Sequence, residues 1–185
     1  MKELSLNILD IAENSTKAKA EHISIEIIET DNSLKITIGD DGYGMTAETL
    51  KAVSDPFYTT RTTRRVGMGI PLFRFAAEQT GGSLYISSRH IDEDPQSHGT
   101  TLTAVFDKTH IDFTPLGDLI STVTTLIQGH PTIDFVFTHI YGDRTVRLDT
   151  AELRQVLEDI PLDTYEVLCW IRENLAEQYN EFNNK

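Results

Sequence analysis

The sequence has little cysteine, little positive charge and no long apolar run, and each shortage excludes a class of protein. Cys169 is the only cysteine among 185 residues, which excludes an internal disulfide and any cysteine-clustered zinc or iron–sulfur site. No run of about 18 apolar residues occurs, so we expect no membrane-spanning helix. The chain carries 16 basic against 29 acidic side chains, a net charge of −13. Such acidity argues against nucleic-acid binding, which needs basic surface to replace phosphate counterions.

The remaining composition is that of a soluble globular protein. Hydrophobic residues make up 39% and charged residues 24% of the chain, enough to bury a real core. The first residues lead into an amphipathic segment and not into the apolar core of a signal peptide. We therefore expect a cytoplasmic protein of one domain, or one domain plus a small appendage.

Hydrophobic periodicity predicts strand pairs that alternate with helices. Helices are expected over residues 3–19, 47–53, 71–79, 116–128, 150–160 and 164–182, and strands over residues 22–29, 33–39, 83–89 and 100–106, with a hairpin inside 133–147. This order predicts an α+β fold, a two-layer sandwich with helices on one face of the sheet. The composition changes near residue 108, so we divide the chain into a region 1–108 and a small acidic α+β region 109–185.

Charge is distributed unevenly along the chain. Between Pro56 and Ala77 there is no acidic residue, whereas Arg61, Arg64 and Arg65 fall in this stretch. A basic, glycine-containing segment in an acidic protein favours the binding of one local anion. The alternative is a solvated loop that happens to carry arginines.

The first predicted helix carries a polar face with the chemistry of a magnesium–phosphate site. Asp10, Asn14 and Lys17 are spaced so that all three project from one side. An amide oxygen is a hard ligand for Mg²⁺, an ammonium meets a phosphate, and a carboxylate can orient or deprotonate water. Alone, these residues are more typical of an ordinary solvated helix face.

Two glycine-containing turns follow. Asp40-Asp41-Gly42-Tyr43-Gly44 comes directly after a strand, where a carboxylate can accept a hydrogen bond from an exocyclic amine and glycines let the backbone approach a flat ring. Gly67-Met68-Gly69 precedes a helix, and exposed N–H groups at a helix N-terminus bind phosphate. Alone, the first turn is compatible with a plain turn and the second with a hinge. Neither is a Walker A loop or a dinucleotide-binding GxGxxG.

Together, the order and spacing of these motifs resemble the GHKL ATPase superfamily, whose ATP-binding domain has the Bergerat fold. The boxes are Asp10 to Lys17, Asp40 to Met45, Asp55 to Arg61, Gly67 to Ile70, Gly81-Gly82, and Gly99-Thr100. The stretch from Pro56 to Phe106 is especially similar to the catalytic domain of histidine kinases. The resemblance covers residues 1 to about 108 and implies ATP and Mg²⁺ as cofactors.

The resemblance also implies a role for each matching residue. Asn14 is implied as the magnesium ligand, Lys17 as a phosphate contact, and Asp40 as the acceptor for the adenine amino group. The other implied contacts are Gly42, Gly44 and Met45 at the base, Thr60 and Arg61 in the lid, Gly67, Met68, Gly69 and Ile70 at the triphosphate, and Thr100 behind the adenine.

Three departures from the family pattern bear on activity. Asp10 stands where hydrolytic members have a glutamate, so its carboxylate reaches about one methylene less far. Arg65 stands where the lid usually has a glycine. The chain begins at the asparagine-containing helix, so we expect no dimerisation domain with a phosphorylated histidine, and any phosphoryl acceptor on another protein.

These observations favour a cytoplasmic, histidine-kinase-like regulatory protein that binds Mg-ATP and transfers the γ-phosphoryl group to a partner protein or hydrolyses ATP slowly. The alternative is a non-catalytic ATP/ADP sensor that signals to a partner through lid closure. A third hypothesis is an interaction domain that has lost nucleotide binding. The apolar faces of the tail helices fit core packing, and are also compatible with a homodimer.

Overall fold

The computed structural model describes residues 2–54 and 69–183. Along this part of the chain the elements are α1 Leu4–Lys17, β1 His22–Glu29, β2 Ser33–Asp40, α2 Ala47–Ser54, α3 Gly69–Gln79, β3 Ser83–Arg89, β4 Gly99–Asp107, α4 Leu119–Gly129, β5 Asp134–Tyr141, β6 Arg144–Asp149, α5 Thr150–Leu157 and α6 Tyr165–Asn183. Among these helices, none is both long and apolar enough to cross a membrane.

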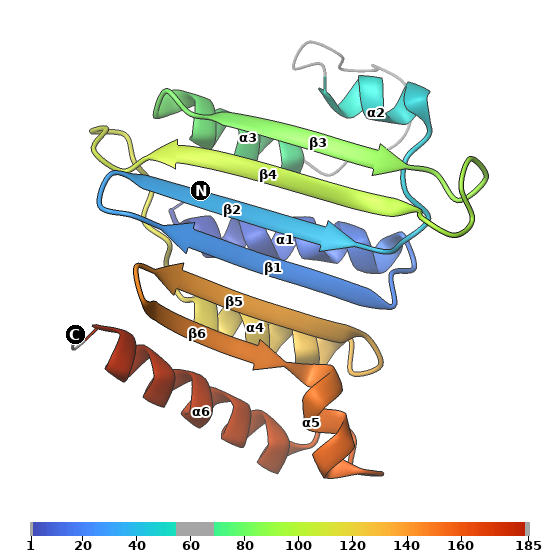
Figure 1. Ribbon diagram of the computed structural model, residues 1–185, viewed down its shortest axis with the longest axis vertical. Coiled ribbons are helices and arrows are strands. Elements are labelled where there is room, and N and C mark those ends of the chain that lie inside the picture. Colours follow the sequence, from blue (N-terminus) through green and yellow to red (C-terminus); the bar gives the residue numbers. More distant parts are fainter. Residues whose placement is uncertain (1, 55–68, 184–185) are drawn as a thin grey trace.

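All the strands named above join one sheet, in the order β3-β4-β2-β1-β5-β6 (Figure 1). The neighbours pair antiparallel except β1 and β5, which run parallel from the pair His22 and Asp134 to the pair Glu29 and Tyr141. The C-terminal strands thus extend the sheet of the N-terminal region. Whether residue 108 marks a domain boundary stays a prediction.

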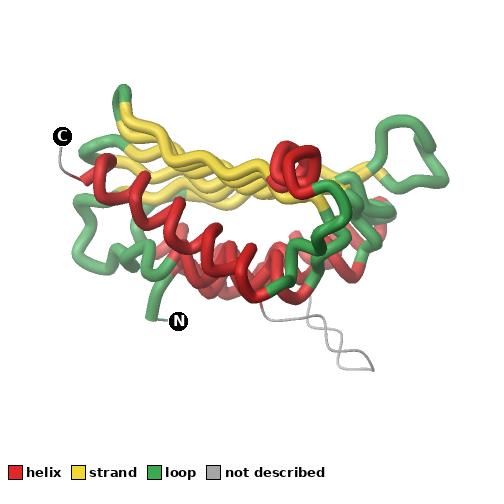
Figure 2. Tube along the Cα trace, turned by 90° about the horizontal axis from the view of Figure 1, so that it is seen from below, coloured by secondary structure: helices red, strands yellow, loops and turns green. Residues whose placement is uncertain are grey.

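One face of the sheet is apolar because its strands alternate in sequence. In β1, Ile23, Ile25 and Ile27 are buried, while Ser24 between them is exposed. Helices α1 and α3 pack on this sheet, and α4 packs beside α1. Figure 2 shows helices lying below the strands when the sheet is seen from its edge. The predicted two-layer α+β sandwich is confirmed.

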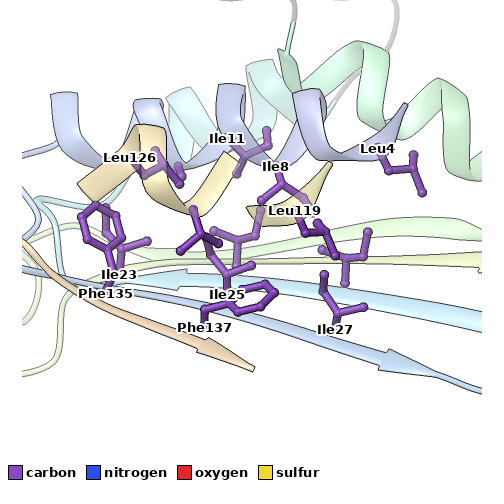
Figure 3. Packing of buried hydrophobic residues seen from close by; sticks show 14 of the residues in the cluster. Leu4, Ile8, Ile11, Ile23, Ile25, Ile27, Leu119, Leu126, Phe135 and Phe137 are labelled. Atoms are coloured by element: carbon purple, nitrogen blue, oxygen red, sulfur yellow. The ribbon is translucent and has the colours of Figure 1, made fainter. Parts of the chain in front are cut away.

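The core spans both halves of the chain. Ile8 and Ile11 of α1 and Leu126 of α4 point toward the strands (Figure 3). They meet Ile25 of β1 and Phe137 of β5, which are both at most 2% exposed. Burial of such side chains stabilises the fold by about 1.5–3 kcal/mol each. The helical layer therefore holds the first helix, and with it Asp10 and Asn14, at a fixed position over the sheet.

Most predicted elements are present, and the differences at their ends have local causes. Helix α4 begins at Leu119 and not at residue 116, because the Asp118 carboxylate accepts a hydrogen bond from the Ser121 N–H at 2.9 Å and caps the helix there. Helix α5 ends at Leu157, before the predicted residue 160, because Glu158 has a φ of 52° that breaks the helical path.

Candidate functional site

A cavity of about 300 Å³ lies between the first helix and the ends of the central strands. Its walls come from α1, β2, β3, β4, the turn after β2, α2 and the start of α3. The lining residues are Ile11, Asn14, Ser15, Ala18, Ile38, Asp40, Gly44, Met45, Val53, Ile70, Ile86, Thr100 and Leu102. Six of the predicted site residues are therefore brought together here, namely Asn14, Asp40, Gly44, Met45, Ile70 and Thr100.

Asp40, the last residue of β2, is held rigidly in this wall. Its Oδ1 accepts hydrogen bonds from the backbone N–H groups of Gly42 at 3.0 Å and Thr100 at 3.3 Å. Its Oδ2 accepts one from the Ser15 hydroxyl at 2.6 Å. A carboxylate offers about four acceptor sites, so Oδ2 keeps capacity for one further donor. Asp40 is thus an oriented hydrogen-bond acceptor at the cavity.

The neighbouring Asp41 is directed elsewhere. Its Oδ1 accepts from the backbone N–H groups of Glu21 at 2.8 Å and His22 at 2.9 Å, and its Oδ2 contacts the His22 Nδ1 at 2.6 Å. The hydrogen bond with the Asp41 carboxylate raises the pKa of His22 above its usual value. Asp41 therefore fastens the start of β1, and only Asp40 lines the cavity.

The turn after β2 depends on glycine at two positions. A Cβ at Gly42 would lie 2.8 Å from the carbonyl oxygen of Ala18, and the neighbouring Tyr43 N–H donates to that oxygen at 2.8 Å. Gly44 has a φ of 68°, and a Cβ there would overlap the carbonyl of Arg89. Because the two glycines have no side chains, the turn packs closely against the end of α1 and forms the rim of the cavity.

A hydroxyl pair supports the far side of the cavity. The Ser88 and Thr100 hydroxyls are 2.8 Å apart, and Ser88 also accepts from the Met45 N–H at 2.8 Å. The sequence predicts a role for Thr100. It predicts none for Ser88, and it does not predict the contact between Ser15 and Asp40. Ser88 pairs with Thr100 in the β3–β4 ladder, and this register cannot be predicted from a single sequence.

Apolar side chains supply the remaining wall. Leu102 pairs with Ile38 on one side and Ile86 on the other, and the three residues form a row across the sheet beneath the cavity. The sequence alone assigns no role in the site to these three residues. Their strand alternation indicates only that they share the buried face. An apolar wall beside an oriented carboxylate suits the binding of a flat ring that carries an amino group.

The polar face of α1 lies at the other end of the cavity. Asn14 is half-buried in the lining, whereas Asp10 and Lys17 are exposed and stand outside it. A Cβ on Gly69, the first residue of α3, would lie 3.0 Å from the Cβ of Asp10. Asp10 is therefore beside the N-terminus of α3, where the helix dipole favours an anion.

The predicted lid falls largely outside the described residues. Thr60, Arg61, Gly67 and Met68 belong to that part of the chain. Gly69 and Ile70 follow it, are buried, and open α3. The end of the predicted phosphate segment thus meets the face of α1 that carries Asp10.

Comparison with known proteins identifies the family. Residues 1–110 match the family described as histidine kinase-, DNA gyrase B-, and HSP90-like ATPases. Because this match covers more than half of the chain, the protein belongs to that family, the GHKL superfamily that its motifs resemble.

Individual relatives agree over parts of the chain. The sensor histidine kinase ZraS of Escherichia coli K12 is 29% identical over 98 residues, which is 52% of this chain and 20% of ZraS. ZraS of Escherichia coli O157:H7 is 30% identical over 83 residues, 44% of this chain and 18% of that protein. The chain thus matches about a fifth of the length of these curated relatives.

Solved structures show the same fold over more of the chain. The Aquifex aeolicus MutL ATPase domain, solved as a complex with ADP, has a TM-score of 0.56 at 14% identity, covering 85% of this chain and 68% of that domain. The N-terminal domain of a DNA repair protein has a TM-score of 0.53 at 18% identity, covering 80% and 53%. At these identities the likeness shows the fold alone, and its coverage of the chain exceeds the length of residues 1–110.

Proposed function

We propose that this chain is a cytoplasmic Mg-ATP-binding regulatory protein that transfers the γ-phosphoryl group to a partner protein or hydrolyses ATP slowly. One observation carries the proposal. The Asp40 carboxylate is fixed by Ser15, Gly42 and Thr100 at the wall of a cavity that also contains Asn14. Membership of an ATPase family supports the same ligand.

In this proposal the base lies in the part of the cavity nearest β2. The free acceptor site of Asp40 takes a hydrogen bond from the adenine amino group, while Ile38, Ile86 and Leu102 exclude water from the ring. Thr100 supports Asp40 through its backbone N–H. A hydrogen bond to a charged acceptor contributes about 1.5–3 kcal/mol, which makes Asp40 the main determinant of base recognition.

The phosphates extend toward Asn14 and the N-terminus of α3. The Asn14 amide oxygen is a neutral, hard donor of the kind that Mg²⁺ accepts, and the residue is positioned in the cavity wall, so it fits as the protein's ligand. Bound Mg²⁺ supplies neutralisation of the phosphate charge. Asp10, exposed beside Gly69, would orient the attacking hydroxyl or water and accept its proton. Lys17 would contact a phosphate from the end of α1.

Calorimetric titration of ATP and ADP, with Mg²⁺ present and then chelated, tests the proposal. We expect ATP to bind more tightly with Mg²⁺. Asp40→Asn replaces one acceptor by a donor facing the amino group and should weaken binding at least about tenfold. Asp41→Asn is the matched control, because Asp41 contacts only the start of β1 and should leave affinity unchanged. Equal affinity in both variants would refute the site.

A second candidate function is an ATP/ADP sensor without turnover, favoured by the short, exposed side chain of Asp10. The two functions differ in the effect of Asp10→Asn. A catalytic role for Asp10 predicts that this variant binds ATP normally but releases or transfers phosphate at least about 100-fold more slowly. Unchanged turnover in the variant would exclude Asp10 as the catalytic base. No turnover in the parent chain beside tight ATP binding would favour the sensor.

A further inference from the structure

The C-terminal helices enclose an apolar groove that the proposed nucleotide chemistry does not use. It has a volume of about 680 Å³ and lies between α5 and α6, beyond the β6 edge of the sheet (Figure 1). Its apolar lining comprises Leu153, Val156 and Leu157 of α5, Ile160 of the turn, and Val167 and Trp170 of α6. The cavity that contains Asp40 has a wholly different lining.

The groove exposes large side chains that ordinarily pack against another element. Val156 is 81% exposed, Ile160 53% and Trp170 48%. In α5 and its turn, the apolar positions 153, 156, 157 and 160 follow the spacing of a ridge that packs on a helix. Within the described part of the chain no segment covers this ridge.

The turn between the two helices fixes the groove's width. Leu162 in this turn is fully buried and anchors it to the core. The Ile160 N–H donates to the Leu157 carbonyl at 3.0 Å, and the Thr164 hydroxyl donates to the Pro161 carbonyl at 3.0 Å. The apolar walls are therefore preformed, which reduces the entropic cost of binding a ligand.

The rim of the groove, meaning Glu166 of its lining and the acidic residues that neighbour lining residues in sequence, is negatively charged. Between Arg154 and Arg172 the sequence has no basic residue, and its four acidic residues are all exposed, namely Glu158, Asp159, Asp163 and Glu166. Arg154 is turned away from this rim, because its Nε donates to the Asp134 carboxylate at 2.7 Å. A ligand that fills the groove must therefore present positive charge around its apolar contacts.

We propose that this groove docks an amphipathic helix of a partner protein, with apolar side chains at helical spacing flanked by lysine or arginine. The inference rests on the proposed function only for the existence of a partner. A second copy of this chain, bound face to face, would bring the same four carboxylates against each other. The walls are helix side chains, and α6 lies alongside β6, so the groove offers no free strand edge for an extended peptide.

Trp170 provides the signal for a direct test, because it is the only tryptophan and lines the groove. The probes are two synthetic 18-residue amphipathic peptides with leucine at the same positions, and with either lysine or glutamate at the others. We expect the leucine–lysine peptide to shift Trp170 emission to shorter wavelength and to bind at least about tenfold more tightly than the leucine–glutamate peptide.

Two variants locate the binding site. Val156→Ser with Ile160→Ser removes apolar contacts without changing charge, and should weaken the leucine–lysine peptide at least about tenfold. Ile111→Ser is the matched control, since Ile111 is 94% exposed in the loop before α4 and outside the groove. Circular dichroism of each variant establishes that it is folded.

The inference is overturned if the leucine–lysine peptide fails to bind, if it binds the groove variant as tightly as the control, or if the leucine–glutamate peptide binds equally well. It is also overturned if sedimentation shows a dimer that the groove variant abolishes. ATP titration of the same samples separates the two proposals. Loss of ATP binding with peptide binding intact refutes only the proposed nucleotide function.

Discussion

Asp40 and Asp41 are adjacent in the chain, yet their carboxylates serve different parts of the molecule. Asp40 is the last residue of β2, and its carboxylate accepts a hydrogen bond from Ser15 of α1. The Asp41 carboxylate instead accepts hydrogen bonds from the backbone of Glu21 and His22. The sequence motif indicates that a carboxylate belongs at this turn. The hydrogen bonds of the two carboxylates show that Asp40, and not Asp41, is placed to contact a ligand in the cavity. This difference makes the paired asparagine variants informative.

Gly42→Ala tests the close approach of the turn to α1. The new Cβ would lie 2.8 Å from the Ala18 carbonyl oxygen and 2.9 Å from the Ala18 Cβ, neither of which can rotate away. We expect a loss of about 1–3 kcal/mol in the free energy of unfolding and weaker ATP binding.

Gly129→Ala is the control for this change. Gly129 is the last residue of α4, and a Cβ there would meet no atom within 4 Å. The free energy of unfolding of this variant should therefore be unchanged or raised by up to about 1 kcal/mol. Urea denaturation measures both variants. Similar stabilities would mean that the turn can move away from α1 at little cost.

At this scale the sequence indicates candidate residues but not the contacts that they make. Asn14 and Asp40 were selected by residue type and spacing, Thr100 was implied by the family resemblance, and all three line the cavity. Ser15 and Ser88 were not given a role, because a serine near a carboxylate or threonine is recognisable only after strands and helix are placed. Lys17 was also selected, but the end of α1 leaves it exposed outside the lining.

At the scale of elements, a polar cluster around the buried His139 connects α6 to the sheet. His139 of β5 is 3% exposed, its Nδ1 lies 3.0 Å from the Tyr179 hydroxyl of α6, and its Nε2 lies 3.0 Å from Glu29 Oε2 of β1. Lys108 Nζ lies 2.6 Å from the other Glu29 oxygen. The cluster therefore joins β1, β5 and α6 through the His139 ring, and Glu29 also holds Lys108.

These contacts make the stability of the protein sensitive to acid. The hydrogen bond from His139, with a further one from Lys108, lowers the pKa of Glu29 from 4.5 to about 2. A lowered carboxyl pKa contributes stability in full above the unfolded value, and this contribution is lost as the pH falls from about 4.5 to about 2. We expect Glu29 to account for a fall of up to about 3 kcal/mol in the free energy of unfolding across that range.

Glu29→Gln should remove this part of the acid sensitivity. The variant should be less stable than the parent at pH 6, because it loses the charged contacts, and the difference should shrink toward pH 2. Glu26→Gln on the same strand serves as the control for the removal of one carboxylate from β1. Urea denaturation at several pH values measures all three. A constant difference between Glu29→Gln and the parent would contradict the assignment.

The elements themselves differ in how well the sequence predicts them. Residues 22–29 were predicted as a strand with the observed bounds, since isoleucines alternate with polar residues and turn residues follow. The pairing of β1 with β5 was not predicted. Periodicity identifies a strand and its buried face, but it carries no information about a neighbour that lies more than 100 residues away.

At the scale of the whole molecule, the shared sheet predicts one cooperative unfolding unit. Ile25 and Phe137 lie in the same core although they belong to the two halves of the chain. Separation of residues 1–108 from residues 109–185 would expose the side chains of Ile25 and Phe137 to water. We therefore expect a single urea transition, coincident for Trp170 fluorescence in α6 and for far-ultraviolet circular dichroism over the whole chain. Two separate transitions would instead support a domain boundary near residue 108.

The parallel pairing of β1 with β5 also sets the order in which the protein can form during its synthesis. Ile23 and its partner Phe135 are 112 residues apart in the chain. At about 5–20 residues per second, the ribosome needs roughly 6 to 22 s to make the intervening stretch. Throughout that time β1 has an open edge that another nascent chain can pair with. Slowing translation within residues 109–134 should therefore increase aggregation of this protein, whereas slowing it before residue 22, where β1 begins, should not.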